Sequence, residues 1–149
     1  MNTFNEFSKR FNKNDHTICA SDLDLHKLEQ AFKIYLPDDF KIFANHFGNL
    51  WTPDVLDIIV DKKIEMFDVQ QFWEINDIFK YKEEGLTPNT PFDIIPFASD
   101  CMGNIFAFLS DRIKDKKETS EIYFLDHDFM TLKKLSNSFT EWIDCFNKI

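Results

Sequence analysis

The sequence predicts an α+β fold, in which helices flank an antiparallel sheet of about five strands. Helical periodicity with capping residues occurs near both ends of the chain, and short apolar segments typical of strands lie between them. The last predicted strands are joined by connections too short for parallel crossovers, which require antiparallel pairing. The 149 residues fit a single domain, 1–149, and no linker divides them.

The first 50 residues predict three helices. Apolar side chains recur at helical spacing in each of them: Phe4, Phe7 and Phe11; Leu25, Leu28, Phe32 and Tyr35; Phe40, Phe43 and Phe47. Ser21 and Asp22 are N-cap candidates for the second helix. Pro37 sets the first position of the third helix, and Gly48 ends it.

The middle of the chain predicts a hairpin followed by a helix. Residues 55–60 are β-branched and apolar, which favours a strand, and residues 64–67 are the expected hairpin partner. Asp68 with Gln71 resembles a capping box that opens a helix. The side chains expected to point inward from this helix are Val69, Phe72, Trp73 and Phe79.

A loop over residues 86–91, containing Pro88 and Pro91, precedes three predicted strands. The strands are expected at residues 92–98, 105–109 and 121–125. Pro96 removes a ladder donor, so the first strand is expected to be at an edge or bulged there. The segment 105–109 is apolar on both faces, which indicates the central strand.

The chain is expected to end in a charged, exposed loop over residues 110–120, the strand at 121–125 and a final helix. Ser138 and Glu141 have capping-box spacing at the start of this helix. Its expected apolar stripe comprises Phe139, Trp142, Ile143 and Phe146.

Composition narrows the function classes. The net charge is −9, with 15 Lys but only 2 Arg, which disfavours binding to nucleic acid or to an anionic membrane. An acidic surface suits a basic protein partner, although the same charge also serves solubility alone.

No apolar run reaches 18 residues, the N-terminus lacks a signal-peptide apolar segment, and three Cys form no paired framework. We therefore expect a cytoplasmic protein.

Aromatic content predicts a well-filled interior, because 18 of the 24 aromatic residues are Phe, which has no polar tip. Trp51 and Trp73 are expected to face the core. Exposure of either one would instead suggest an interface.

Catalytic motifs are sparse. Three Gly cannot form a P-loop or a dinucleotide fingerprint, and no metalloprotease or nucleophile-elbow motif occurs. Asp126, His127 and Asp128 could make a partial metal site, but Asp side chains in such a turn also bond nearby backbone amides. Cys101 could pair with His127 as a nucleophilic dyad or act as a small apolar filler. We expect no enzymatic activity, metal or cofactor.

Other carboxylates lie in predicted loops. Asp100 occupies the turn at 99–104, where turn chemistry and partner binding both explain it. Asp111, Asp115 and Glu118 are mixed with lysines, as in many solvated loops.

Three segments, taken together, resemble the SUKH superfamily, which is named for yeast cell-wall-assembly regulators. The segments are Leu36-Pro37-Asp38-Asp39-Phe40 with Phe47-Gly48; residues 95–104; and residues 123–128 with 135–142. Together they span roughly residues 21–147. The middle motif departs from the family pattern at Met102, where a second glycine is usual.

The resemblance implies a non-catalytic α+β domain. Many bacterial members are immunity proteins that bind and block a secreted polymorphic toxin, often a nuclease. The expected partner is therefore a basic toxin domain, and the residues expected to bind it are Asp100, Asp111, Asp115, Glu118, Asp126 and Asp128. A scaffold or regulatory module is the first alternative, and a small metal-dependent enzyme using Asp126, His127 and Asp128 is the second.

Overall fold

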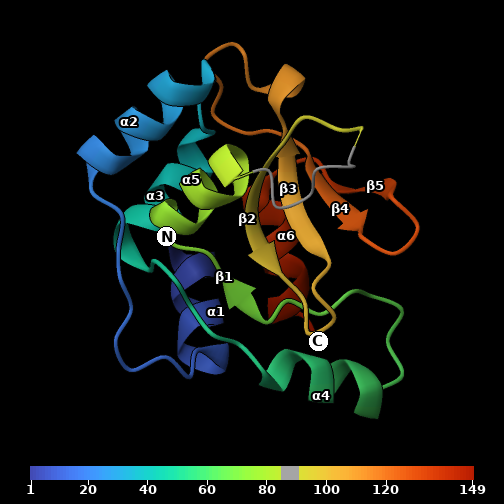
Figure 1. Ribbon diagram of the computed structural model, residues 1–149. Helices are drawn as coiled ribbons and strands as arrows, with labels where there is room; N and C mark the ends of the chain where they lie inside the picture. The colour runs from blue at the N-terminus through green and yellow to red at the C-terminus, as the bar shows by residue number, and fades with distance from the viewer. Residues whose placement is uncertain (85–90) are drawn as a thin grey trace.

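The computed structural model describes residues 1–84 and 91–149 as helices packed against a five-stranded sheet (Figure 1). The helices are α1 (Asn2–Phe11), α2 (Asp22–Phe32), α3 (Asp38–His46), α4 (Asp54–Asp61), α5 (Ile75–Glu84), the 3₁₀ turn η1 (Ser110–Arg112) and α6 (Phe139–Asn147). The strands are β1 (Gln71–Phe72), β2 (Ile94–Ser99), β3 (Ile105–Leu109), β4 (Ile122–Asp126) and β5 (Thr131–Ser136). The α+β class is confirmed.

The sheet has the order β1-β2-β3-β4-β5, and every neighbouring pair is antiparallel. β3 is the central strand, as its two apolar faces predicted. The register of β2 against β3 shifts between Pro96 and Ala98, so the bulge expected at the proline is confirmed.

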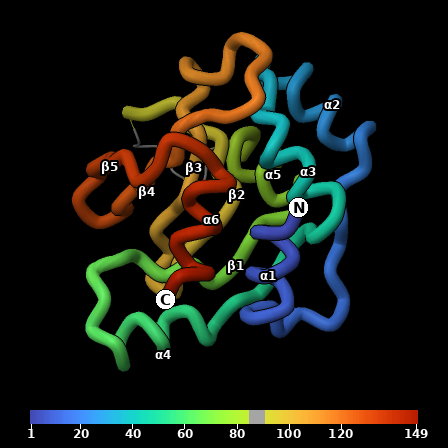
Figure 2. Tube along the Cα trace, turned by 180° about the vertical axis from the view of Figure 1, so that it is seen from behind, coloured from blue at the N-terminus to red at the C-terminus, as the bar shows by residue number. Residues whose placement is uncertain are grey.

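Both faces of the sheet are covered. Helix α6 lies behind the sheet in Figure 1 and in front of it in Figure 2, and α5 lies on the opposite side. One face packs against aromatic rings from α1, α3 and α6, and the other face packs against Tyr81 of α5. The Phe-rich composition therefore fills the larger core, as predicted.

Local capping signals set the starts of the predicted helices. Ser21 and Asp24 form a reciprocal capping box at α2, and the Ser138 hydroxyl accepts the Glu141 amide at α6. Gly48 follows α3 with φ 68°, and a Cβ there would lie 2.2 Å from the Ile18 carbonyl oxygen. This close approach explains why the third helix ends at a glycine.

Three predictions for the middle of the chain are wrong. Residues 55–60 lie in helix α4, where Val55 and Ile59 are buried one turn apart. Pro53 and the first-turn carboxylates of Asp54 and Asp57 are helix-start signals that outweigh the β-branched composition. Residues 64–67 consequently form no strand.

The expected capping box at Asp68 does not form either. Strand β1 occupies Gln71–Phe72 and pairs with β2, and helix α5 begins only at Ile75. The Asp68 carboxylate instead accepts the backbone amide of Cys101 at the end of β2. Trp73 therefore precedes the helix, and its indole donates to Ser99 Oγ.

Two further features differ from expectation. Trp51 is 43% exposed and does not face the core, whereas Trp73 is partly buried against it. Strand β5 was not predicted, because its apolar residues Leu132 and Leu135 are an odd number apart and pack on opposite sides of the sheet. Residues 86–90 of the predicted loop fall outside the described residues.

The burial of Phe97 predicts a large contribution of its ring to the stability of the fold. Phe97 is 1% exposed and packs against the rings of Phe40, Phe108, Phe139 and Trp142. We expect Phe97→Ala to lower the free energy of unfolding by about 3–5 kcal/mol in urea denaturation, because it leaves a cavity.

The matched control is Phe129→Ala, which truncates an exposed ring and should cost less than about 0.5 kcal/mol. Equal losses in the two variants would contradict this assignment of the core.

Candidate partner-binding site

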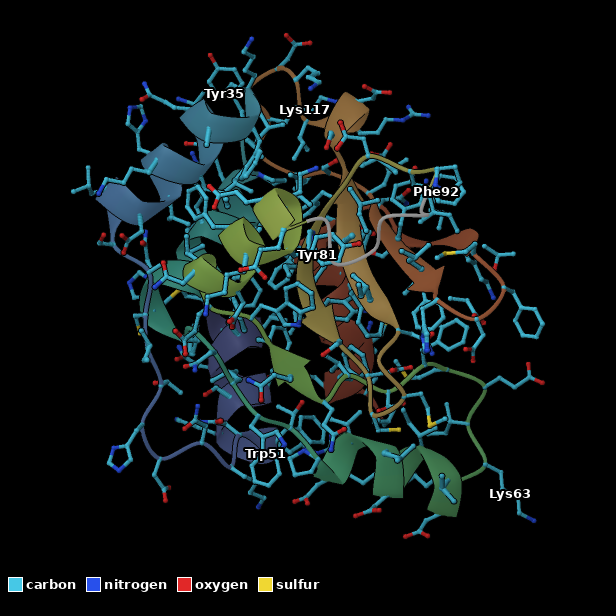
Figure 3. The ribbon with its side chains drawn as sticks, in the orientation of Figure 1. Tyr35, Trp51, Lys63, Tyr81, Phe92 and Lys117 are labelled. Atoms are coloured by element: carbon cyan, nitrogen blue, oxygen red, sulfur yellow. The ribbon has the colours of Figure 1, made fainter. Side chains whose placement is uncertain are left out.

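The six acidic residues predicted to bind a partner lie at opposite ends of the sheet. Asp100 follows the end of β2, Asp126 is the last residue of β4 and Asp128 comes shortly after it. Asp111, Asp115 and Glu118 follow the end of β3. Because these strands are antiparallel, the two groups are separated by the length of a five-residue strand, roughly 15 Å. Lys117, labelled in Figure 3, marks the second group at the top of the molecule.

The β2–β3 turn is organised around the Asp100 carboxylate. Its Oδ1 accepts the backbone amides of Met102 at 2.9 Å and Asn104 at 2.8 Å. Its Oδ2 accepts the Asn104 side-chain amide at 2.9 Å. Turn chemistry therefore uses both carboxylate oxygens of Asp100.

Asn104 joins this turn to the β4–β5 turn. Its Oδ1 accepts the backbone amide of His127 at 3.1 Å and lies 2.8 Å from His127 Nδ1. Since the Asn104 amide nitrogen donates to Asp100, Oδ1 is the acceptor and Nδ1 of His127 carries the proton. Gly103 has a φ of 84°, a left-handed conformation that favours glycine, whereas a Cβ there would make only ordinary van der Waals contact with His127 Cε1, at 3.7 Å.

The β4–β5 turn has its own internal bonds. Asp126 Oδ1 accepts the backbone amides of Asp128 at 2.9 Å and Phe129 at 3.1 Å, and Met130 adopts a left-handed φ of 51°. Asp128 Oδ1 lies 3.3 Å from His127 Nε2, and its side chain is 72% exposed. We call residues 100–104 and 126–130 the paired turns, since Asn104 connects them.

The paired turns hold no assembled metal site. The residues in the ranges 1–84 and 91–149 contain no group of three or more His, Cys, Asp or Glu placed to hold an ion. Asp126 Oδ1 accepts two backbone amides, and His127 Nδ1 bonds Asn104. This geometry matches the turn-chemistry interpretation of the Asp126, His127 and Asp128 sequence.

Cys101 lacks the environment of a nucleophile. Cys101 is an exposed residue, but partial desolvation of its thiol and the nearby charges of Asp68 and Asp100 raise the pKa of that thiol, which keeps the sulfur protonated. The ring nitrogens of His127 face Asn104 and Asp128. The dyad interpretation therefore gains no support from the geometry.

Two kinds of residue at this end were not predicted from sequence. Asp68 is only 8% exposed, and burial, reinforced by the charge of Asp100, raises the pKa of its carboxyl. Phe67, Met102 and Phe129 are exposed apolar side chains, at 38%, 69% and 78%. The Phe67 ring stacks on Phe124 with 3.9 Å between centroids. The exposure of these side chains depends on tertiary packing, which the sequence pattern does not reveal.

A comparison with protein-family models finds a match that spans both paired turns and the sheet between them. The family model of the SMI1 / KNR4 family (SUKH-1) matches residues 19–145, which include α2, the entire sheet and both paired turns. The chain belongs to the SMI1/KNR4 family. The SUKH resemblance of the three sequence motifs is thus confirmed. A search of curated proteins found no match.

In this SMI1/KNR4 family member, the far end of the sheet, where residues 110–120 lie, differs from the paired turns in its charge. Residues 110–120 are anchored, since Ile113 is fully buried and the carbonyls of Lys117 and Glu118 accept the amides of Asp38 and Asp39. Asp111, Asp115 and Glu118 are exposed, but the same segment carries four basic residues: Arg112, Lys114, Lys116 and Lys117. The local charges nearly cancel, unlike those of the paired turns, which carry three Asp and no Lys or Arg.

No helix in the described part of the chain is long and apolar enough to span a bilayer.

The Asn104 bridge predicts a measurable coupling between the paired turns. We expect Asn104→Ala to lower the free energy of unfolding by about 1–2 kcal/mol, because it leaves the His127 donors without their acceptor. The His127 backbone amide should also exchange faster in hydrogen-exchange measurements.

The control is Asn5→Ala, an exposed position on α1 that should not lose stability. Unchanged exchange at His127 in the Asn104 variant would show that the two turns are held independently.

The buried Asp68 predicts a pH dependence of stability. Because its pKa is raised in the folded state, its contribution is present below the unfolded pKa and is lost as pH rises through the folded pKa. Wild type should therefore lose stability relative to Asp68→Asn as pH rises from about 4 to 7. Denaturation series at several pH values measure this difference, and a difference that stays constant would contradict the prediction.

Proposed function

We propose that this protein is an immunity protein that binds a cognate secreted polymorphic toxin, a nuclease, and neutralises it by stoichiometric protein–protein inhibition. Membership of the SMI1/KNR4 (SUKH-1) family is consistent with this role. The observation that carries the proposal is the Asn104–His127 bridge, which joins two acidic turns into one surface. In this role the protein acts in the cytoplasm and needs no catalysis of its own.

The charge of the paired turns supports a basic partner. Asp100, Asp126 and Asp128 lie at one end of the sheet, in a protein whose net charge is −9. A nuclease presents a basic cleft to its phosphate substrate, so an acidic surface can occupy the same cleft. Of the three, Asp128 has the most available charge, because its side chain is 72% exposed.

The rigidity of the paired turns supports tight binding. Asp100 and Asp126 each bond two backbone amides, so the loop conformations are largely set before a partner arrives. Preorganisation lowers the entropy cost of association. Asp111, Asp115 and Glu118 remain a predicted second contact, which would require the partner to reach the far end of the sheet.

The resemblance to bacterial immunity proteins implies that the cognate toxin domain is encoded beside this protein's gene, and a direct test uses that domain. We expect co-expression to restore growth of bacteria that produce the domain, and its purified activity to fall to zero at one equivalent of inhibitor. Full toxin activity in a tenfold molar excess would contradict the proposal. Binding of an endogenous non-toxin protein instead would favour the alternative role of a regulatory or scaffold module.

Charge substitutions test which end of the sheet meets the toxin. We expect the association rate of wild type to fall steeply as salt rises, because screening shortens electrostatic steering. Asp128→Asn should slow association about threefold and reduce its salt dependence, while Asp115→Asn should change it little. Stopped-flow mixing measures these rates. A rate indifferent to salt, or equal effects of the two variants, would remove the charge-matching part of the proposal.

A further inference from the structure

The side chain of Phe129 is unusual within this protein. All 18 Phe lie in the described ranges, and most fill the core, yet Phe129 is 78% exposed, more than any other. It lies in the turn between β4 and β5, a hairpin that projects from the right side of the molecule in Figure 1. Aromatic residues, including Phe, are enriched at protein interfaces.

The backbone beneath this ring is held in place. Asp126 Oδ1 accepts the Phe129 amide itself at 3.1 Å, and the next residue, Met130, has a left-handed φ of 51°. A non-glycine residue in this conformation is uncommon, and such positions cluster at binding sites. The Asn104–His127 bonds fix the same turn to its neighbour. The ring is therefore presented by an ordered turn.

The charges around the ring define the partner chemistry. Asp126 and Asp128 lie within three residues of Phe129, and the first basic residue that follows is Lys133. Lysine or arginine on the partner would pair with these carboxylates and could also pack on the ring face. A second copy of this chain would bring the same carboxylates against them, which repel.

We propose that Phe129 is the apolar anchor of the interface, entering an apolar pocket rimmed by lysine or arginine on the surface of a basic protein partner. The inference rests on the proposed function for the identity of that partner as a toxin. Met102 on the other paired turn is a second exposed apolar side chain, at 69%. The carboxylates of Asp126 and Asp128 favour a basic partner, and burial of the Phe129 ring slows its dissociation.

The first test measures affinity for the toxin domain encoded beside the gene. We expect Phe129→Ala to raise Kd about 30-fold or more, mainly through faster dissociation. The control Val60→Ala truncates another exposed apolar side chain, 63% exposed on α4, and should change Kd less than twofold. Both variants should keep the wild-type unfolding midpoint. A Kd within twofold of wild type for Phe129→Ala overturns the anchor and leaves the immunity role standing.

A second test applies if wild type does not bind that domain, which would contradict the immunity role. Benzoylphenylalanine, a photo-crosslinking residue, replaces Phe129 or, as a control, Val60 in cells of the source organism. Crosslinking from position 129 alone to a peptide with apolar residues between Lys or Arg supports the anchor. Equal yields from both positions, no adduct, or an adduct with a second copy of this chain overturns it.

Discussion

The burial of Phe139 between the sheet and the N-terminal helices connects the parts of this protein that are distant in sequence. Its ring packs against Phe4 of α1, Phe40 and Phe43 of α3 and Phe97 of β2. Asp39 of α3 secures the same junction, because its carboxylate accepts the amide and hydroxyl of Thr140 in the first turn of α6. With α6 fixed against the sheet, the strand ends and the turns that follow them have defined positions.

The turns divide their polar groups between structure and surface. Asp100 and Asp126 bond backbone amides and shape the turns, whereas the exposed carboxylate of Asp128 is available to a partner. Carboxylates that satisfy turn amides still contribute negative potential, so one residue type serves both needs. The core is made of apolar side chains, many of them Phe, which need no polar partners.

Local signals predicted much of the fold but not the assembly of the site. Caps at Ser21 and Ser138 and the bulge at Pro96 depend on neighbouring residues, and the structure has all three. Residues 55–60 form a helix and not the predicted strand, because the helix-start residues Pro53, Asp54 and Asp57 outweigh the β-branched composition. The Asn104–His127 bridge depends on the register of β3 with β4, and the exposure of Phe129 depends on tertiary packing. Neither can be predicted from sequence spacing alone.

The central claim is that the paired turns are the surface on which a partner binds. Hydrogen-exchange mass spectrometry of this protein, alone and in complex with the proposed toxin domain, tests it most directly. We expect slower exchange in residues 100–104 and 126–130 on complex formation, with residues 110–120 little changed. Protection confined to residues 110–120, with the paired turns exchanging as in the free protein, would contradict the claim.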